Sequence, residues 1–171
     1  MQHETLLVVD FGSQVTQLIA RRIRELGVFA EIVPCQRASE RLAALGKSVR
    51  GIVLSGGPSS IYDEGAPTMP AGVLELGVPV LGICYGLYVL VQACGGEVAR
   101  ADEREYGGSI LTVLEPLGPL AGFDPLRPEP VWMSHGERVT ALPPGFRTVG
   151  SSVNCVFAAI VEPTRRLWGV Q

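Results

Sequence analysis

The residues best suited to covalent chemistry lie in the run Gly82-Ile83-Cys84-Tyr85-Gly86. A cysteine thiolate is a strong nucleophile, and this spacing matches the Gly-x-Ser-x-Gly turn that presents a serine between a strand and a helix. The flanking glycines have a steric reason, since a Cβ beside so tight a turn would meet neighbouring backbone. The helix that follows directs its positive dipole end at the sulfur, which favours the thiolate. The run therefore indicates a catalytic cysteine, with a glycine-rich turn carrying a buried thiol as the alternative.

A cysteine nucleophile also needs donors for the oxyanion that forms during attack. The backbone N–H of Tyr85, directly after the cysteine, is one candidate. The loop Ser55-Gly56-Gly57-Pro58 follows another predicted strand and could supply a second donor, although by itself it also fits an ordinary turn. The loop is too short for a phosphate-binding P-loop and lacks its lysine. We therefore predict an oxyanion site between this loop and the cysteine.

The base that would activate the thiol has only two histidine candidates in this sequence. His3 lies in the N-terminal tail. His135 is a predicted loop residue within the run Met133-Ser134-His135-Gly136-Glu137, with a carboxylate two residues on. On the residues alone His135 is the candidate base, with a surface or structural histidine as the alternative.

The first half of the chain alternates apolar strands with helices. Strands are expected at residues 5–10, 29–33, 51–54 and 78–83, and helices at 14–26, 39–45, 71–76 and 87–93. Continuous apolar strands separated by helices are typical of a parallel sheet with helices on its faces. Ser13 is expected to cap the first helix. The candidate cysteine then follows the carboxyl end of a strand, where open α/β sheets bind their ligands.

The second half of the chain contains short predicted strands and no long helix. Glycine- and proline-rich turns separate strands expected at 97–99, 109–114, 131–134, 147–150, 156–161 and 167–171. These strands are expected to extend the same sheet in antiparallel fashion. The fold class is therefore α/β, a mainly parallel sheet flanked by helices with an antiparallel C-terminal extension. Without an internal repeat or a long linker, residues 1–171 are expected to form one domain.

Composition narrows the classes of function. The net charge of −3 argues against nucleic acid or an anionic membrane as a partner, and no apolar run is long enough to span a membrane. The four cysteines contain no CxxC pair, which indicates neither a zinc site nor a disulfide scaffold. We therefore expect no metal, and reduced thiols in a cytoplasmic protein. The four are Cys35, Cys84, Cys94 and Cys155.

The sequence contains, in this order, five motifs: Val9-Asp10-Phe11-Gly12-Ser13-Gln14, Leu54-Ser55-Gly56-Gly57-Pro58, Gly82-Ile83-Cys84-Tyr85-Gly86, Arg104-Glu105-Tyr106-Gly107 and Trp132-Met133-Ser134-His135-Gly136. The same order is found in the GMP synthetase branch of the class I glutamine amidotransferases, and the chain resembles that family over nearly its whole length. The resemblance implies a sheet flanked by helices and a Cys-His-Glu triad, in agreement with the fold class above. The motif sequences of this chain match those of the anthranilate and carbamoyl-phosphate types of amidotransferase less well.

The resemblance implies a role for each matching residue. Cys84 matches the nucleophile that forms a thioester with the glutamine side chain, and Gly57 and Tyr85 match the oxyanion donors. A further group matches the loop that holds the α-amino and carboxylate groups of glutamine, which would make His135 a substrate-binding residue. That group is Ser134, His135 and Gly136.

The family also implies partners. Ammonia released from glutamine passes to an ATP-pyrophosphatase (synthetase) domain, fused or separate, which uses ATP and Mg²⁺ to aminate XMP to GMP. No cofactor is expected in the glutaminase domain itself.

Two positions depart from the family pattern. The family carries a glutamine that contacts substrate four residues after the nucleophile, whereas this chain has Tyr88. The triad histidine and glutamate come from a His-Pro-Glu motif that follows the strand at 167–171, and this sequence ends at Gln171. We therefore expect residues 1–171 to be C-terminally incomplete and to hydrolyse glutamine poorly alone. The alternative function is that of a non-catalytic homologue that binds glutamine or a partner.

Overall fold

A computed structural model describes residues 3–171, apart from the side chains of residues 102–105. The chain forms two compact units, Met1–Val89 and Leu90–Gln171. The side chains of Arg104 and Glu105, which belong to one of the five motifs, lie outside the described residues. None of the helices in the described part of the chain is long and apolar enough to cross a membrane.

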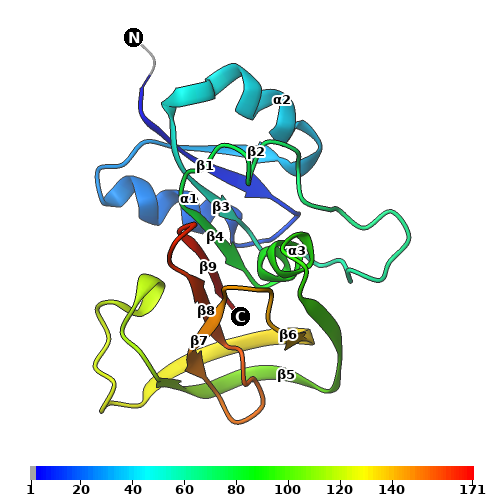
Figure 1. The fold of residues 1–171 in the computed structure, drawn as a ribbon, viewed down its shortest axis with the longest axis vertical. Helices are drawn as coiled ribbons and strands as arrows, with labels where there is room; N and C mark the ends of the chain where they lie inside the picture. Colours follow the sequence, from blue (N-terminus) through cyan, green and yellow to red (C-terminus); the bar gives the residue numbers. More distant parts are fainter. Residues whose placement is uncertain (1–2) are drawn as a thin grey trace. The chain divides into compact units, whose positions relative to one another are not determined.

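The first unit contains a parallel sheet of four strands (Figure 1). The spatial order of these strands is β2-β1-β3-β4. Because the strands are parallel, their carboxyl ends share one edge of the sheet. The segments that follow β1, β3 and β4 therefore all begin at that edge. The strands are β1 (Thr5–Asp10), β2 (Ala30–Pro34), β3 (Val49–Leu54) and β4 (Val80–Ile83).

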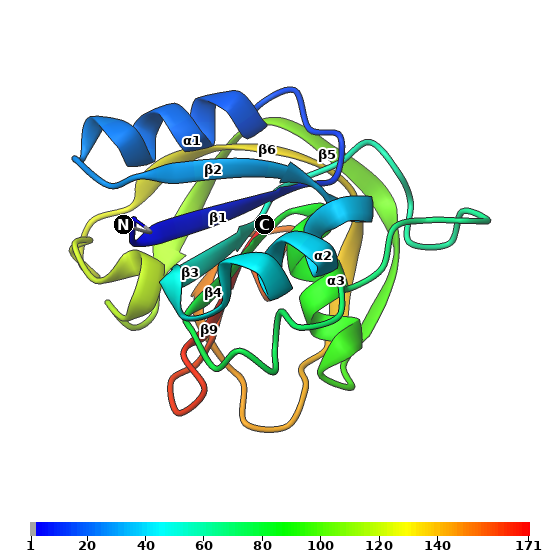
Figure 2. The ribbon, with the colours of Figure 1, turned by 90° about the horizontal axis from the view of Figure 1, so that it is seen from above.

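Helices cover both faces of this sheet. Helix α1 (Thr16–Glu25) packs its Ala20 against a cluster that includes Val8 and Val53. Helix α2 (Cys35–Leu45) lies on the opposite face, where its Arg41 pairs with Glu31 of β2 (Figure 2). Side chains alternate between the two faces of a strand, which is why each strand here is apolar at nearly every position. The predicted parallel sheet with flanking helices is confirmed.

Several boundaries differ from the sequence-based expectations. Helix α1 begins at Thr16 rather than residue 14, because the Ser13 hydroxyl accepts the N–H of Val15 in a turn before the helix. Helix α2 begins at Cys35, four residues before the predicted start at residue 39. The helix predicted at 71–76 was wrong: this segment forms consecutive turns, and Gly72 within it has a φ of +92°.

The second unit is an antiparallel sheet with the strand order β9-β8-β7-β5-β6. Its core gathers residues from β5, β6, β7 and β8, including Leu111, Met133, Val149 and Val161. The predicted antiparallel C-terminal strands are confirmed. The strands are β5 (Glu97–Val113), β6 (Glu129–Ala141), β7 (Arg147–Ser151), β8 (Ala159–Glu162) and β9 (Leu167–Val170).

Two of these strands are much longer than expected (Figure 1). The predicted strands at 97–99 and 109–114 are parts of one strand of 17 residues, β5. Its partner β6 has 13 residues and pairs with it along most of its length, with a register irregularity between Arg100 and Glu105. Polar residues and glycines interrupt the apolar pattern of β5. The sequence therefore predicted two short strands where the backbone pairing with β6 continues.

Candidate active site

Cys84 lies between the end of β4 at Ile83 and the start of helix α3 (Tyr85–Ala93). Its φ is +51°, in the left-handed region that residues with a Cβ adopt at a cost of about 1–3 kcal/mol. The Cys84 carbonyl accepts the N–H of Tyr88 at 3.2 Å, so the helical hydrogen bonds begin at the cysteine itself. The predicted strand-to-helix turn with unusual backbone angles at Cys84 is confirmed.

The glycines on either side of Cys84 are required by close backbone contacts. A Cβ on Gly82 would lie 2.6 Å from the carbonyl oxygen of Gly86, and a Cβ on Gly86 would lie 2.2 Å from the carbonyl oxygen of Leu54. Both distances are far below contact between non-bonded atoms, and the atoms met are backbone atoms that cannot turn away. The steric reason expected from the sequence is thus present at both positions.

The loop after β3 lies beside the cysteine. A Cβ on Gly56 would be 3.7 Å from the Cβ of Cys84, and the N–H of Gly86 donates to the Ser55 carbonyl at 3.0 Å. Gly57 is packed closely on the loop after β1, where a Cβ added to Gly57 would lie 2.5 Å from the carbonyl oxygen of Phe11. The structure therefore brings the predicted oxyanion loop next to the predicted nucleophile.

Tyr85 occupies the first position of α3, where backbone N–H groups point out of the helix end. Its side chain is buried: the hydroxyl donates to the carbonyl of Pro67 at 2.7 Å, and the ring contacts that of Phe11. Tyr88 is also buried, one turn further along α3. The contacts of Tyr85 thus help to fix the start of the helix that follows the cysteine.

His3 lies at the wrong end of the first unit to act on Cys84. It precedes β1 and its ring contacts that of Phe29, which precedes β2. Both residues are therefore at the amino ends of the parallel strands, whereas Cys84 follows a carboxyl end. The six residues of β1 alone span about 20 Å.

The prediction that His135 lies in a loop after the strand expected at 131–134 was wrong, because strand β6 continues through His135. Ser134 is exposed, Gly136 is half-buried, and the side chain of His135 is only 4 % exposed. His135 Nδ1 lies 3.0 Å from the carbonyl oxygen of Glu137. Alternation along the strand, which turns Ser134 and His135 to opposite faces, explains this difference in burial.

Burial disfavours ionisation of the other cysteines. Burial raises the pKa of the Cys35 thiol, and the negative charge of the nearby Asp10 carboxylate raises it further. Burial also raises the pKa of the Cys94 thiol, against the opposing effect of Arg165. Cys155 is almost completely buried in the core of the second unit. None of the four cysteines is in a disulfide.

A polar network, to which the sequence analysis assigned no role, joins the half-buried Asp10 to two buried hydroxyl groups, one of them in the loop after β3. The Thr16 hydroxyl lies 2.8 Å from an Asp10 carboxylate oxygen and 3.2 Å from the Ser55 hydroxyl. Asp10 also accepts the N–H of Gly12, and Ser55 accepts the N–H of Phe11. The available signal was the polar residue Asp10 at the end of a buried apolar strand, inside one of the five motifs.

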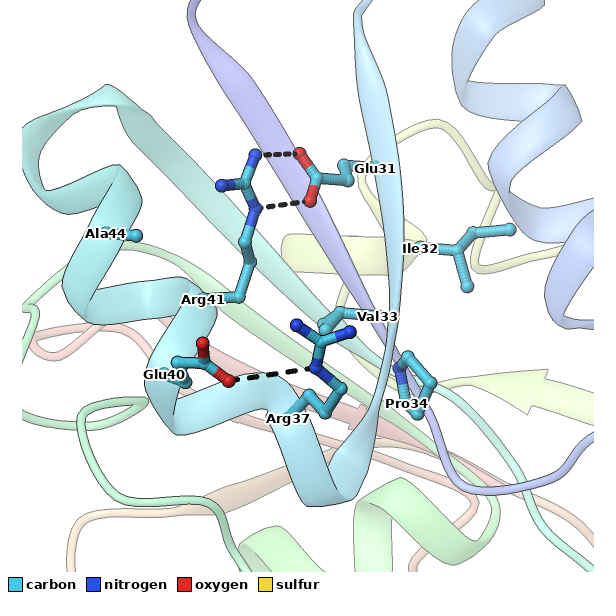
Figure 3. A pocket seen from close by; sticks show the side chains of 8 residues that line it. All are labelled: Glu31, Ile32, Val33, Pro34, Arg37, Glu40, Arg41 and Ala44. Atoms are coloured by element: carbon cyan, nitrogen blue, oxygen red, sulfur yellow. Dashed lines mark hydrogen bonds and ion pairs between the residues drawn. The ribbon is translucent and has the colours of Figure 1, made fainter.

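A pocket of 330 Å³ lies elsewhere in the first unit, between β2 and α2 (Figure 3). It contains none of the predicted site residues. Arg41 donates two hydrogen bonds to Glu31 across it, which hold the pKa of the Glu31 carboxyl below its usual value. This pair therefore stabilises the fold above the ordinary glutamate pKa, and that contribution is lost as the pH falls through the lowered value.

A cysteine on a strained strand-to-helix turn, beside a glycine loop from the neighbouring strand, defines an α/β protein with a thiol at a nucleophile elbow. The family model for class-I glutamine amidotransferases matches residues 7–171. The chain therefore belongs to the class-I glutamine amidotransferase family.

Similar sequences agree with this assignment. The glutamine-hydrolysing GMP synthase of Nitratidesulfovibrio vulgaris is 47% identical over 166 residues, which cover 97% of this chain and 32% of that protein. The protein of the same name from Cereibacter sphaeroides is 48% identical over 172 residues, covering 99% of this chain and 33% of that protein. The chain thus spans about a third of the length of these relatives.

Solved structures share the fold. A Thermoplasma acidophilum protein, proposed to be one of the subunits of a GMP synthase, superposes with a TM-score of 0.82 at 28% identity, covering 100% of this chain and 84% of that one. A glutamine amidotransferase from Thermotoga maritima superposes with a TM-score of 0.78 at 20% identity, covering 100% and 76%. The latter likeness concerns the fold alone.

Proposed function

We propose that this chain hydrolyses the side-chain amide of glutamine through a thioester on Cys84. The observation that carries the proposal is the position of Cys84, at a turn with positive φ and next to the Gly56-Gly57 loop. Membership of the amidotransferase family and relatives named glutamine-hydrolysing GMP synthase support it.

In this mechanism the Cys84 thiolate attacks the amide carbon of the glutamine side chain. The carbonyl oxygen becomes an oxyanion, which the backbone N–H groups of Gly57 and Tyr85 stabilise. The tetrahedral intermediate then collapses: the carbon–nitrogen bond breaks, the leaving nitrogen takes a proton, and ammonia departs. Water next attacks the thioester to give glutamate and to restore the thiol.

Neither histidine of residues 1–171 suits the role of base. His3 lies at the amino ends of the parallel strands, and the buried ring of His135 is held against the Glu137 carbonyl. We propose that a histidine and a glutamate outside these residues complete the triad. Ser134, His135 and Gly136 would instead bind the α-amino and carboxylate groups of glutamine, as the family resemblance implies.

The ammonia is proposed to serve the amination of XMP to GMP, in purine nucleotide biosynthesis. The two relatives at 47% and 48% identity bear the name GMP synthase and are about three times as long as the matched region. A synthetase domain, which would use ATP and Mg²⁺, is therefore the proposed partner. No cofactor or metal is proposed for the glutaminase chemistry itself.

Treatment of the full-length protein with a glutamine-mimicking electrophile, such as a diazo-ketone analogue, tests the proposal. We expect Cys84 to be modified first, since burial raises the pKa of the Cys35 and Cys94 thiols and encloses Cys155. Peptide mapping identifies the modified residue, and excess glutamine should protect it. Preferential modification of another cysteine, or labelling that glutamine does not slow, would contradict the proposed site.

Tyr88 gives a second candidate function, glutamine or partner binding without catalysis. It occupies the position at which the family carries a substrate-contacting glutamine, and its side chain is buried. We expect Tyr88→Gln to tighten glutamine binding by about 1 kcal/mol, because an amide offers both donors and an acceptor where a phenol offers one hydroxyl. Calorimetry on the full-length protein measures the change, and unchanged or weaker binding would refute this role for Tyr88.

A further inference from the structure

A hydrogen-bond network of the half-buried Asp10 and the buried Thr16 and Ser55 joins segments that are far apart in the sequence. Thr16 and Ser55 are 1% and 0% exposed, and their hydroxyl oxygens lie 3.2 Å apart. One Asp10 oxygen lies 2.8 Å from both the Thr16 hydroxyl and the Gly12 N–H. The Ser55 hydroxyl accepts the N–H of Phe11 at 3.2 Å. The end of β1, the start of α1 and the loop after β3 are therefore fixed to one another.

The Thr16 hydroxyl is the link between the carboxylate and the loop. It carries one proton and lies within hydrogen-bond distance of Asp10 and Ser55, so it donates to one of them at a time. Asp10 is the stronger acceptor, because hydrogen bonds to ionised groups are shorter and stronger than neutral ones. Removing this hydroxyl takes a charge-assisted hydrogen bond from the half-buried Asp10 and a polar neighbour from the fully buried Ser55.

The network bears on the proposed oxyanion site through two backbone contacts. Gly57 rests on the Phe11 carbonyl, and the Phe11 N–H donates to the Ser55 hydroxyl. The Ser55 carbonyl also accepts the N–H of Gly86 at 3.0 Å, which attaches the loop to the start of α3. Ser55 thus contacts both sides of the proposed oxyanion site, through its side chain on one side and its backbone on the other.

We infer that Asp10, Thr16 and Ser55 are positioning residues that hold the Gly57 N–H in place for the oxyanion. The inference rests on the proposed glutaminase function. None of the three residues is required to touch glutamine. Loss of the network should therefore weaken stabilisation of the transition state and leave ground-state binding of glutamine nearly unchanged.

The variant Thr16→Val in the full-length protein tests this inference, because valine keeps the volume and branching of threonine and removes only the hydroxyl. We expect kcat for glutamine hydrolysis to fall about 10- to 100-fold, less than the 10²–10³-fold typical of deleting an oxyanion donor. KM should change less than about twofold. Thr16→Ser, which keeps the hydroxyl, should restore most of kcat.

The rate at which iodoacetamide alkylates Cys84 distinguishes a positioning role from a general structural defect, because a general defect at the elbow would change this rate. Displacement of iodide forms no oxyanion, so its rate reports the thiolate and its accessibility alone. We expect this rate to be the same in Thr16→Val as in the unmodified protein. Thr5→Val is the matched control: Thr5 is equally buried, donates to the His3 carbonyl, and lies at the opposite end of β1. It should leave kcat unchanged.

The outcomes separate the two proposals. If the unmodified full-length protein does not hydrolyse glutamine, the proposed function fails. If the unmodified protein does hydrolyse glutamine, two results for Thr16→Val would refute the positioning role. One is an unchanged kcat, and the other is a fall in kcat that is accompanied by a fall in the alkylation rate. Should Thr16→Val not fold, Ser55→Ala removes the acceptor of the Phe11 N–H from the other side. In Ser55→Ala we again expect a lowered kcat with an unchanged rate of alkylation. Any other combination of these two results overturns the inference.

Discussion

Replacement of Cys84 by alanine is expected to lower the rate of glutamine hydrolysis by the full-length protein at least about 10⁴-fold, as loss of a covalent nucleophile does in other hydrolases. Alanine removes the sulfur that is proposed to form the thioester and leaves the backbone of the elbow in place. Glutamine binding should persist, because the residues proposed to hold its α-amino and carboxylate groups are untouched. Initial rates of ammonia release measure the first effect, and calorimetry measures the second.

Matched serine variants at Cys35 and Cys94 serve as controls. Both thiols are half-buried and lie outside the elbow, so each variant should retain activity within about twofold. Ammonia-dependent synthesis, with ammonium salt supplied in place of glutamine, should survive in Cys84→Ala if the synthetase partner is intact. Substantial glutamine hydrolysis by Cys84→Ala would remove Cys84 from the chemistry altogether.

Replacement of Gly86 by alanine is expected to destabilise the protein by about 3 kcal/mol or more, at the severe end for a single methyl group. The added Cβ would lie 2.2 Å from the Leu54 carbonyl oxygen and 2.6 Å from its carbonyl carbon. Because Leu54 belongs to β3, relief of the clash requires helix α3 to move away from the sheet. The hydrogen bond from the Gly86 N–H to Ser55 would be lost with that movement.

Chemical denaturation of the Gly86→Ala variant measures this loss. Gly122→Ala is the control, since a Cβ at that exposed position meets nothing within 4 Å and its φ is not positive. That substitution should change the free energy of unfolding by no more than about 0.5 kcal/mol. If Gly86→Ala unfolds at the same denaturant concentration as the unmodified protein, the contact between α3 and β3 is less close than described.

The elbow could be predicted from the sequence because its signal is local. An apolar strand, two glycines around a cysteine and an apolar helix follow one another within 78–93, and each constrains the next. The same holds for the parallel strands, whose apolar runs are short and uninterrupted. Cys84 and the loop at Gly56 could then be placed at one edge of the sheet, since parallel strands end at the same side.

The polar network and the long hairpin could not be predicted in this way. Thr16 and Ser55 are 39 positions apart, and nothing in the local pattern shows that one hydroxyl faces the other. Strand β5 continues through polar residues and Gly107 because β6 pairs with it, which is a long-range contact. For the same reason, the segment around His135 was predicted as a loop although its backbone lies in that ladder.

The positive φ of Cys84 places stability in opposition to the proposed catalysis at a single residue. Only glycine adopts this conformation without strain, and glycine has no sulfur. Directed evolution for heat resistance alone would therefore favour the substitution Cys84→Gly and discard the reaction, whereas selection for ammonia supply would retain a residue that the backbone disfavours. Thermostabilised variants of this chain are best sought with the cysteine held fixed and with an activity screen at every round.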